Sequence, residues 1–216
     1  MSRTTSLRSP ATSAKTDSSL PLFQPGGGRD DAVLAASRAV VGLFLRERSS
    51  DFSIKALAEH AGLSERTFYR YFPRKEDAIR PYLEAGLAHL VTRLRGSPRT
   101  QPLPDVLMAV HSEMFEQGHP LDGEVLLGVL NGTERLRAVW LQVLTDAEVA
   151  YANVVAEWLG IAADSLQARL AGAVVVTATR LALQRPALEP RAPSQVFADC
   201  LTLLGPSLFS SSGPPS

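Results

Sequence analysis

Hydrophobic residues recur at helical spacing along most of the chain, and the pattern is sharpest between residues 53 and 75. There an apolar stripe at positions i, i+3, i+4 and i+7 consists of Ile54, Leu57, Ala58 and Ala61. Ser53 precedes the stripe as an N-cap, and Gly62 follows it, where a left-handed residue ends a helix at little cost. Ser64 then caps a second short helix, expected at residues 65–72. This pattern is typical of a helix-turn-helix.

The same spacing predicts helices on both sides of this motif. A first helix begins at Asp30 or Asp31, and a longer one spans about 77–95 with Pro81 in its first turn, where a missing amide hydrogen is tolerated. Further helices are expected at about 105–117, 123–130, 134–159, 165–185 and 195–204. We find no strand-like alternation, so the predicted fold class is all-α, with about nine helices.

Composition divides the chain into four parts. Residues 1–28 are rich in Ser, Thr, Pro and Gly, which predicts a disordered tail. Residues 29–90 would form an N-terminal three-helix DNA-binding domain, with its helix-turn-helix at 53–72. Residues 91–208 would form a C-terminal helical domain, and 209–216 a second disordered tail.

The second helix of the motif carries a polar, basic face. Arg66, Thr67, Arg70 and the hydroxyl of Tyr69 can project outward, and Lys75 follows shortly after. Arg suits the O6/N7 edge of guanine, whereas Lys and helix N-termini suit phosphates. The formal net charge is zero, but residues 1–95 hold 15 Lys/Arg against 10 Asp/Glu, and the remainder holds 7 against 12. The positive half therefore coincides with the predicted DNA-binding half.

Three segments, Ile54–Ser64, Thr67–Phe72 and Lys75–Ile79, closely resemble the DNA-binding domain of the TetR family of bacterial transcriptional regulators. The resemblance covers about residues 31–90. It implies that DNA is contacted by Ser53, Lys55, Ser64, Arg66, Thr67, Tyr69, Arg70, Tyr71 and Lys75. Glu65 departs from the pattern, since many members carry a basic or small residue there, and its carboxylate suits the positive end of a helix or a cytosine amino group.

The last two predicted helices present more apolar surface than one face of each needs. The residues are Leu166, Leu170, Ala173, Val174, Thr177 and Leu181 on one, and Val196, Phe197, Cys200, Leu201 and Leu204 on the other. Gly172 and Ala173 are small enough for a close helix approach. Two such hairpins would form a four-helix bundle and a homodimer, as the TetR resemblance also implies. A purely intramolecular core is the alternative.

The region between residues 105 and 159 is the candidate pocket for a small apolar effector. The candidate ligand-binding residues are His111, Met114, Phe115, Asn131, Trp140, Leu144 and Tyr151. For any one of them, ordinary core packing is the more frequent role. A weaker resemblance of this region to TetR ligand domains implies an apolar, acyl-CoA-like ligand.

These features favour a ligand-released repressor that binds a palindromic DNA operator as a dimer. A transcriptional activator and a helical adaptor without DNA binding are the alternatives. An enzyme is disfavoured because the four His and the single Cys200 have no metal-site spacing, and no cofactor is expected.

Two further features bear on where the protein acts. The lone Cys indicates a reducing compartment. The chain lacks a run of 18 apolar residues and an apolar signal segment at its start, which favours the bacterial cytoplasm and no membrane partner.

Overall fold

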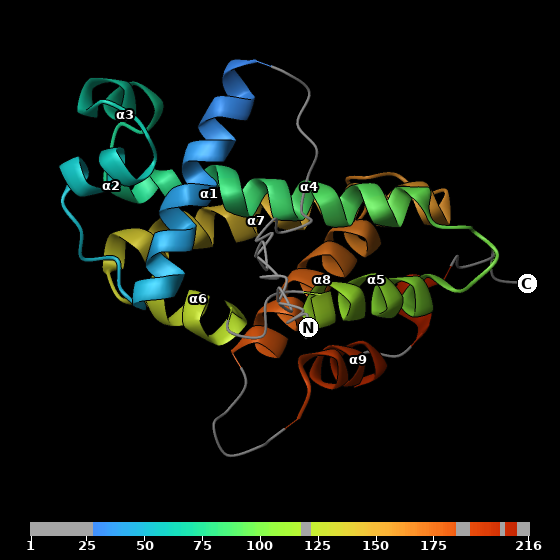
Figure 1. The fold of residues 1–216 in the computed structure, drawn as a ribbon. Helices are drawn as coiled ribbons and strands as arrows, with labels where there is room; N and C mark the ends of the chain where they lie inside the picture. The colour runs from blue at the N-terminus through green and yellow to red at the C-terminus, as the bar shows by residue number, and fades with distance from the viewer. Residues whose placement is uncertain (1–27, 118–121, 185–190, 204–205, 211–216) are drawn as a thin grey trace, which may run out of the picture.

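The computed structural model describes residues 28–117, 122–184, 191–203 and 206–210. Within these ranges every regular element is helical, so the all-α prediction is confirmed (Figure 1). The elements are α1 (Arg29–Glu47), α2 (Ile54–His60), α3 (Glu65–Tyr71), η1 (Lys75–Ile79), α4 (Arg80–Gly96), α5 (Leu103–Gln117), α6 (Asp122–Asn131), α7 (Glu134–Leu159), α8 (Leu166–Leu183), α9 (Pro193–Leu203) and η2 (Pro206–Phe209).

The helices form a head and a body (Figure 1). The head consists of α1, α2 and α3, while α5 and α9 lie at the other end of the molecule. Helices α4 and α7 run between the two, and α8 crosses the middle and ends beside α6. Each part has its own core. The head core includes Val40, Phe44, Leu57, Phe68 and Phe72, and it is completed by Leu130 and Trp140 from α6 and α7. The body core includes Leu94, Leu107, Tyr151, Val175 and Phe197.

The caps and the turn of the helix-turn-helix form as predicted. The Ser53 hydroxyl accepts a hydrogen bond from the Ala56 amide at 3.2 Å, and Ser64 accepts one from Thr67 at 3.2 Å. Gly62 adopts φ +68°, a left-handed conformation that glycine tolerates best. These local features fix where α2 and α3 begin and allow the chain to turn between them.

The helix predicted at 77–95 begins differently. Residues 75–79 form the 3₁₀ turn η1, and the α-helix proper starts at Arg80, which donates its amide hydrogen to the Asp77 carbonyl. Pro81 lies in the first turn of α4, as expected. Since Pro81 has no amide hydrogen, it cannot make the bond to Asp77 that would continue one α-helix across this point. The head and the body are therefore joined by a change of helix type.

The close helix approach predicted at Gly172 occurs within one chain, between α8 and α7. A Cβ at this position would clash with the carbonyl oxygen of Glu148 and lie 2.8 Å from the Ala152 amide nitrogen. The predicted start of the second tail at residue 209 was wrong, because Phe209 is buried in the body core. Three of the predicted segments cannot be compared with the structure. Residues 1–27 of the first predicted tail, Leu204, and residues 211–216 lie outside the described residues.

Within the described ranges, α8 is the one helix long and apolar enough to span a membrane, judged by length and composition alone. Core helices of soluble proteins meet the same criteria. In this structure α8 packs along α7 and α9, and its inward-facing side is buried.

Candidate nucleic-acid interface and ligand domain

The basic flank of α3 is solvent-exposed, as the sequence predicted. Phe68 and the following Phe72 are buried in the head core and contact each other edge to face, with 5.1 Å between ring centroids. Arg66, Tyr69 and Arg70 are exposed on the outer side of the helix. Figure 1 places α3 at the edge of the molecule, away from the body. The inner face thus anchors the helix, and the outer face is open to a partner.

Ser64, Thr67 and Tyr71 have structural partners of their own. The Ser64 hydroxyl donates to Thr67 Oγ1 at 3.0 Å, in addition to capping α3. Tyr71 is half-buried against the head core, and the Arg70 guanidinium lies 5.5 Å from the centre of its ring. A cation over an aromatic face is attracted by the ring electrons, which fixes the direction in which Arg70 extends. Ser53 and Lys55, at the start of α2, are exposed.

Lys75 has an intramolecular role that the sequence pattern does not reveal. Its Nζ donates to the Phe52 carbonyl oxygen at 3.3 Å, and the Phe52 ring stacks on Phe44 with 6.0 Å between centroids. This bond joins the segment after α3 to the segment before α2, 23 residues earlier in the chain. An ammonium group has three donors, so the bond to Phe52 leaves capacity for a phosphate oxygen.

His111 and Tyr151 form a closed polar pair inside the body. The His111 carries its proton on Nδ1, because this atom lies 2.8 Å from the Leu107 carbonyl oxygen, which can only accept. Nε2 therefore accepts from the Tyr151 hydroxyl at 3.0 Å. The imidazole also stacks on Phe197, 4.2 Å between ring centroids. Burial lowers the pKa of His111 to about 4, against the smaller opposing effect of the Leu107 bond, and raises the pKa of Tyr151.

The seven candidate ligand residues divide between the two cores. His111, Met114, Phe115 and Tyr151 belong to the body core or pack against it. Trp140 is buried in the head core, and Asn131 is exposed, with its side-chain amide donating to the Leu127 carbonyl at 2.9 Å. Leu144 packs against both cores. The structure therefore does not gather Asn131 and Trp140 with the other candidates.

Large apolar side chains are exposed on α8 and at the end of α9. Relative exposures are 83% for Leu166, 50% for Leu170, 42% for Leu181 and 85% for Leu203. Of the residues predicted to form the interface, Phe197 and Leu201 are instead buried in the body core. Val196 and Cys200 are half-buried, and burial raises the pKa of the Cys200 thiol. Across the described residues, no cluster of three or more His, Cys, Asp or Glu is placed to hold a metal ion.

Comparison with known proteins identifies the type of domain that the head contains. Residues 44–79, from the end of α1 to the end of η1, match the family model of the bacterial regulatory proteins of the TetR family. The chain carries a TetR-family helix-turn-helix domain. A search of curated proteins finds no match.

Most of the chain shares the fold of TetR-family regulators of known structure. It is similar to the crystal structure of Thermus thermophilus FadR, a TetR-family transcriptional repressor in complex with lauroyl-CoA, with a TM-score of 0.58 and 22% identity over 87% of this chain and 99% of that one. It is also similar to a TetR-family transcriptional regulator from Streptomyces coelicolor, with a TM-score of 0.51 and 22% identity over 82% of each chain. At these identities the likeness shows the fold of the TetR family.

Proposed function

We propose that the protein is a transcriptional repressor of the bacterial cytoplasm that binds a palindromic DNA operator as a homodimer and leaves it when a small apolar ligand binds. The observation that carries this proposal is the exposed row Arg66, Tyr69 and Arg70 on a helix anchored by buried Phe68 and Phe72. In the proposed division, residues 29–90 bind DNA and 91–210 bind the ligand and the second chain.

The roles of the DNA-facing residues follow from their chemistry. Arg66 and Arg70 suit the paired acceptors of guanine in the major groove, and Thr67 and Tyr69 suit a base edge or a phosphate. Ser53, Lys55 and Ser64 lie at the starts of α2 and α3, where amide hydrogens and the helix dipole favour phosphate. Tyr71 and Lys75 would contribute through the atoms that their intramolecular contacts leave available.

Selection from a random duplex library tests the DNA-binding proposal. The wild type is expected to enrich a palindrome, and Arg70→Ala is expected to weaken binding by about 1–3 kcal/mol and relax the choice of one base pair. Arg93→Ala removes an exposed Arg of α4, far from the head, and serves as the matched control. Enrichment by neither protein would favour the helical adaptor. If the protein binds a palindrome but keeps its affinity when ligand is added, the result would favour a transcriptional activator over a ligand-released repressor.

Dimerisation would cover the exposed leucines of α8 and α9. A single recognition helix buries too little surface for strong discrimination, whereas a twofold dimer places two such helices about 34–36 Å apart on one side of the duplex. The exposed side chains of Leu166, Leu170, Leu181 and Leu203 provide the apolar surface that such an interface needs.

Sedimentation analysis tests the dimer. Leu170→Glu would bury two like charges, one from each chain, and the protein is expected to sediment as a monomer. Ala88→Glu, on an exposed position of α4, is the control and is expected to remain a dimer. A wild type that sediments as a monomer at all concentrations, or an unaffected Leu170→Glu, would remove this part of the proposal.

The ligand would lie among the apolar side chains near His111 and Tyr151. Met114, Phe115 and Leu144 are half-buried there, so they can move with less loss than fully packed residues. FadR of T. thermophilus, with the same fold, holds lauroyl-CoA. We therefore propose an acyl-CoA-like ligand, and lauroyl-CoA titrated into the protein–operator complex is the first test. A 100-fold loss of DNA affinity requires a ligand preference of about 2.7 kcal/mol for the released state.

A further inference from the structure

The junction between the head and the body lies at residues 78–82, where η1 ends and α4 begins. Ser37 of α1 is fully buried against this junction. Its hydroxyl donates to the Ala78 carbonyl oxygen at 2.5 Å and accepts from the Tyr82 amide at 3.0 Å. Residues 78 and 82 are four apart, the pair that one α-helical turn would join directly. A side chain of the head thus bridges the backbone where the helix type changes.

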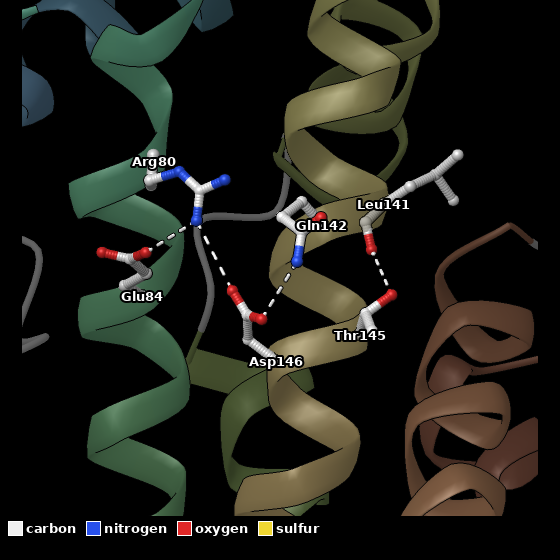
Figure 2. Close-up of polar contacts among 6 residues, drawn as sticks. All are labelled: Arg80, Glu84, Leu141, Gln142, Thr145 and Asp146. Carbon is white, nitrogen blue, oxygen red and sulfur yellow. Dashed lines mark hydrogen bonds and ion pairs between the residues drawn. The ribbon is translucent and has the colours of Figure 1, made fainter.

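The outer side of the same junction carries a polar network (Figure 2). Arg80 Nη1 lies 3.1 Å from Glu84 Oε1 on the next turn and 3.5 Å from Asp146 Oδ2 on α7. The other carboxylate oxygen of Asp146 accepts from the Gln142 side-chain amide at 3.1 Å. Glu84 and Gln142 thus orient the two partners from within their own helices. The ion pair connects the first residue of α4 to the middle of α7.

A second ion pair connects the same two helices at their far ends. Arg95 makes two bonds to Glu157, at 3.0 and 2.7 Å, and both side chains are about half-exposed. Paired bonds of this kind are geometrically specific, whereas the single 3.5 Å contact of Arg80 with Asp146 is weaker. The α4–α7 pair is therefore held more firmly at its far end than beside the head.

We propose that Arg80 and Asp146 are positioning residues. Their ion pair holds the junction at residues 78–82 in the conformation that orients the recognition helix α3. The inference rests on the proposed function insofar as orientation of α3 matters for DNA. The pair is partly exposed, at 33% for Arg80 and 52% for Asp146, so it can break and reform at little cost. Loss of the pair would let the head sample other orientations about the Ser37 contact.

The test measures the orientation of the head in the protein without DNA. Spin labels are attached at Glu59→Cys on α2 and Ala162→Cys after α7, two exposed positions, in a Cys200→Ser background. Labelled protein is diluted into unlabelled protein so that distances are measured within one chain. Pulsed electron paramagnetic resonance then gives the distribution of head-to-body distances.

Arg80→Ala and Asp146→Ala are each expected to broaden or shift this distribution, and the double variant is expected to resemble either single one. Arg80→Lys keeps the charge and is expected to restore most of the original distribution. Glu157→Ala breaks the far ion pair of the same two helices and is the matched control, expected to leave the width near the wild type. An unchanged distribution in Arg80→Ala, or an equal change in Glu157→Ala, would overturn the proposal.

Affinity for the selected palindrome gives the second measurement. Removing an ion pair of this exposure costs about 0.2–1 kcal/mol, so Arg80→Ala and Asp146→Ala are expected to lose at most about five-fold in affinity. The losses should be non-additive in the double variant. If the distances respond but no DNA is bound by any variant, the ion pair stands and the proposed function fails. A loss of affinity in Arg80→Ala but not in Asp146→Ala, with unchanged distances, would assign Arg80 to a direct phosphate contact and contradict the positioning role.

Discussion

The two short helices of the helix-turn-helix and the helices of the body are fixed by contacts of different range along the chain. In the head, α2 and α3 are defined by bonds between residues three apart, Ser53 with Ala56 and Ser64 with Thr67. In the body, His111 bonds to Tyr151, 40 residues away, and Gly172 of α8 lies directly against α7. Local bonds leave a signature in the sequence, and distant ones do not. Variants that separate the two kinds of contact test this contrast.

The largest effect is expected at Gly172, in the body. Gly172→Ala adds a Cβ that meets the Glu148 carbonyl oxygen and the Ala152 backbone, which are fixed parts of α7. Because backbone cannot rotate away, α7 and α8 must separate, and we expect a loss of about 3 kcal/mol in the free energy of unfolding, measured by urea denaturation. Gly86→Ala in α4 is the control, since a Cβ there meets nothing within 4 Å. Equal stability of both variants would show that the close approach carries no energetic weight.

The second effect concerns the buried His111. Its pKa is lowered to about 4 by burial, against 6.5 for an exposed His, so the unfolded chain takes up a proton first as the pH falls. The stability contributed by neutral His111 is complete above about pH 6.5, declines between 6.5 and 4, and then levels off. We expect a loss of about 2 kcal/mol between pH 7 and pH 5 from this group.

Denaturation of the wild type and of His111→Gln at a series of pH values isolates this contribution, because the carboxylates titrate equally in both. Gln keeps a hydrogen-bonding side chain at the position but does not titrate. The difference in unfolding free energy between the two proteins should change with pH, with the wild type losing more toward pH 5. A constant difference would mean that the pKa of His111 is the same in the folded protein as in the unfolded chain.

The sequence predicted the head more fully than the body for a physical reason. Ser53, Gly62 and Ser64 act on backbone groups within a few residues, so their identity and spacing predict the fold they produce. The sequence gives no reason to rank His111 above Asn131 as a ligand residue. No local pattern shows that His111 bonds to Tyr151 or that Asn131 bonds to its own helix. Whether either contacts a ligand stays a prediction.

Local features at the head-to-body link were also only partly predictable. Pro81 indicated the start of a helix, but the 3₁₀ turn before it depends on packing of α1 and α7 against η1. Trp140 belongs to the head core because the start of α7 reaches the head, which an apolar residue in a periodic pattern cannot show. The exposed flank of α3 was predictable, since its polar face lacks apolar residues that would need covering.

A smaller effect is expected at a cap of the head. Ser64→Ala removes the hydroxyl that accepts the Thr67 amide, and we expect a loss of about 1 kcal/mol in the free energy of unfolding. Ser64→Asp keeps an acceptor and should retain most of the stability. Thermal unfolding followed by circular dichroism measures both variants. A loss in Ser64→Asp equal to that in Ser64→Ala would show that the side chain serves something other than the cap.

The smallest effect, of opposite sign, is expected at Gly42 in α1. A Cβ at this position meets nothing within 4 Å, and the residue lies inside a regular helix. Gly42→Ala restricts the unfolded chain more than the folded one, so a gain of about 0.5–1 kcal/mol in the free energy of unfolding is expected. Paired with Gly172→Ala, the same substitution should therefore raise stability in the head and lower it in the body. If both variants are destabilised, α1 must also pack closely against a neighbour at Gly42. The head and the body would then not differ in their tolerance of this substitution.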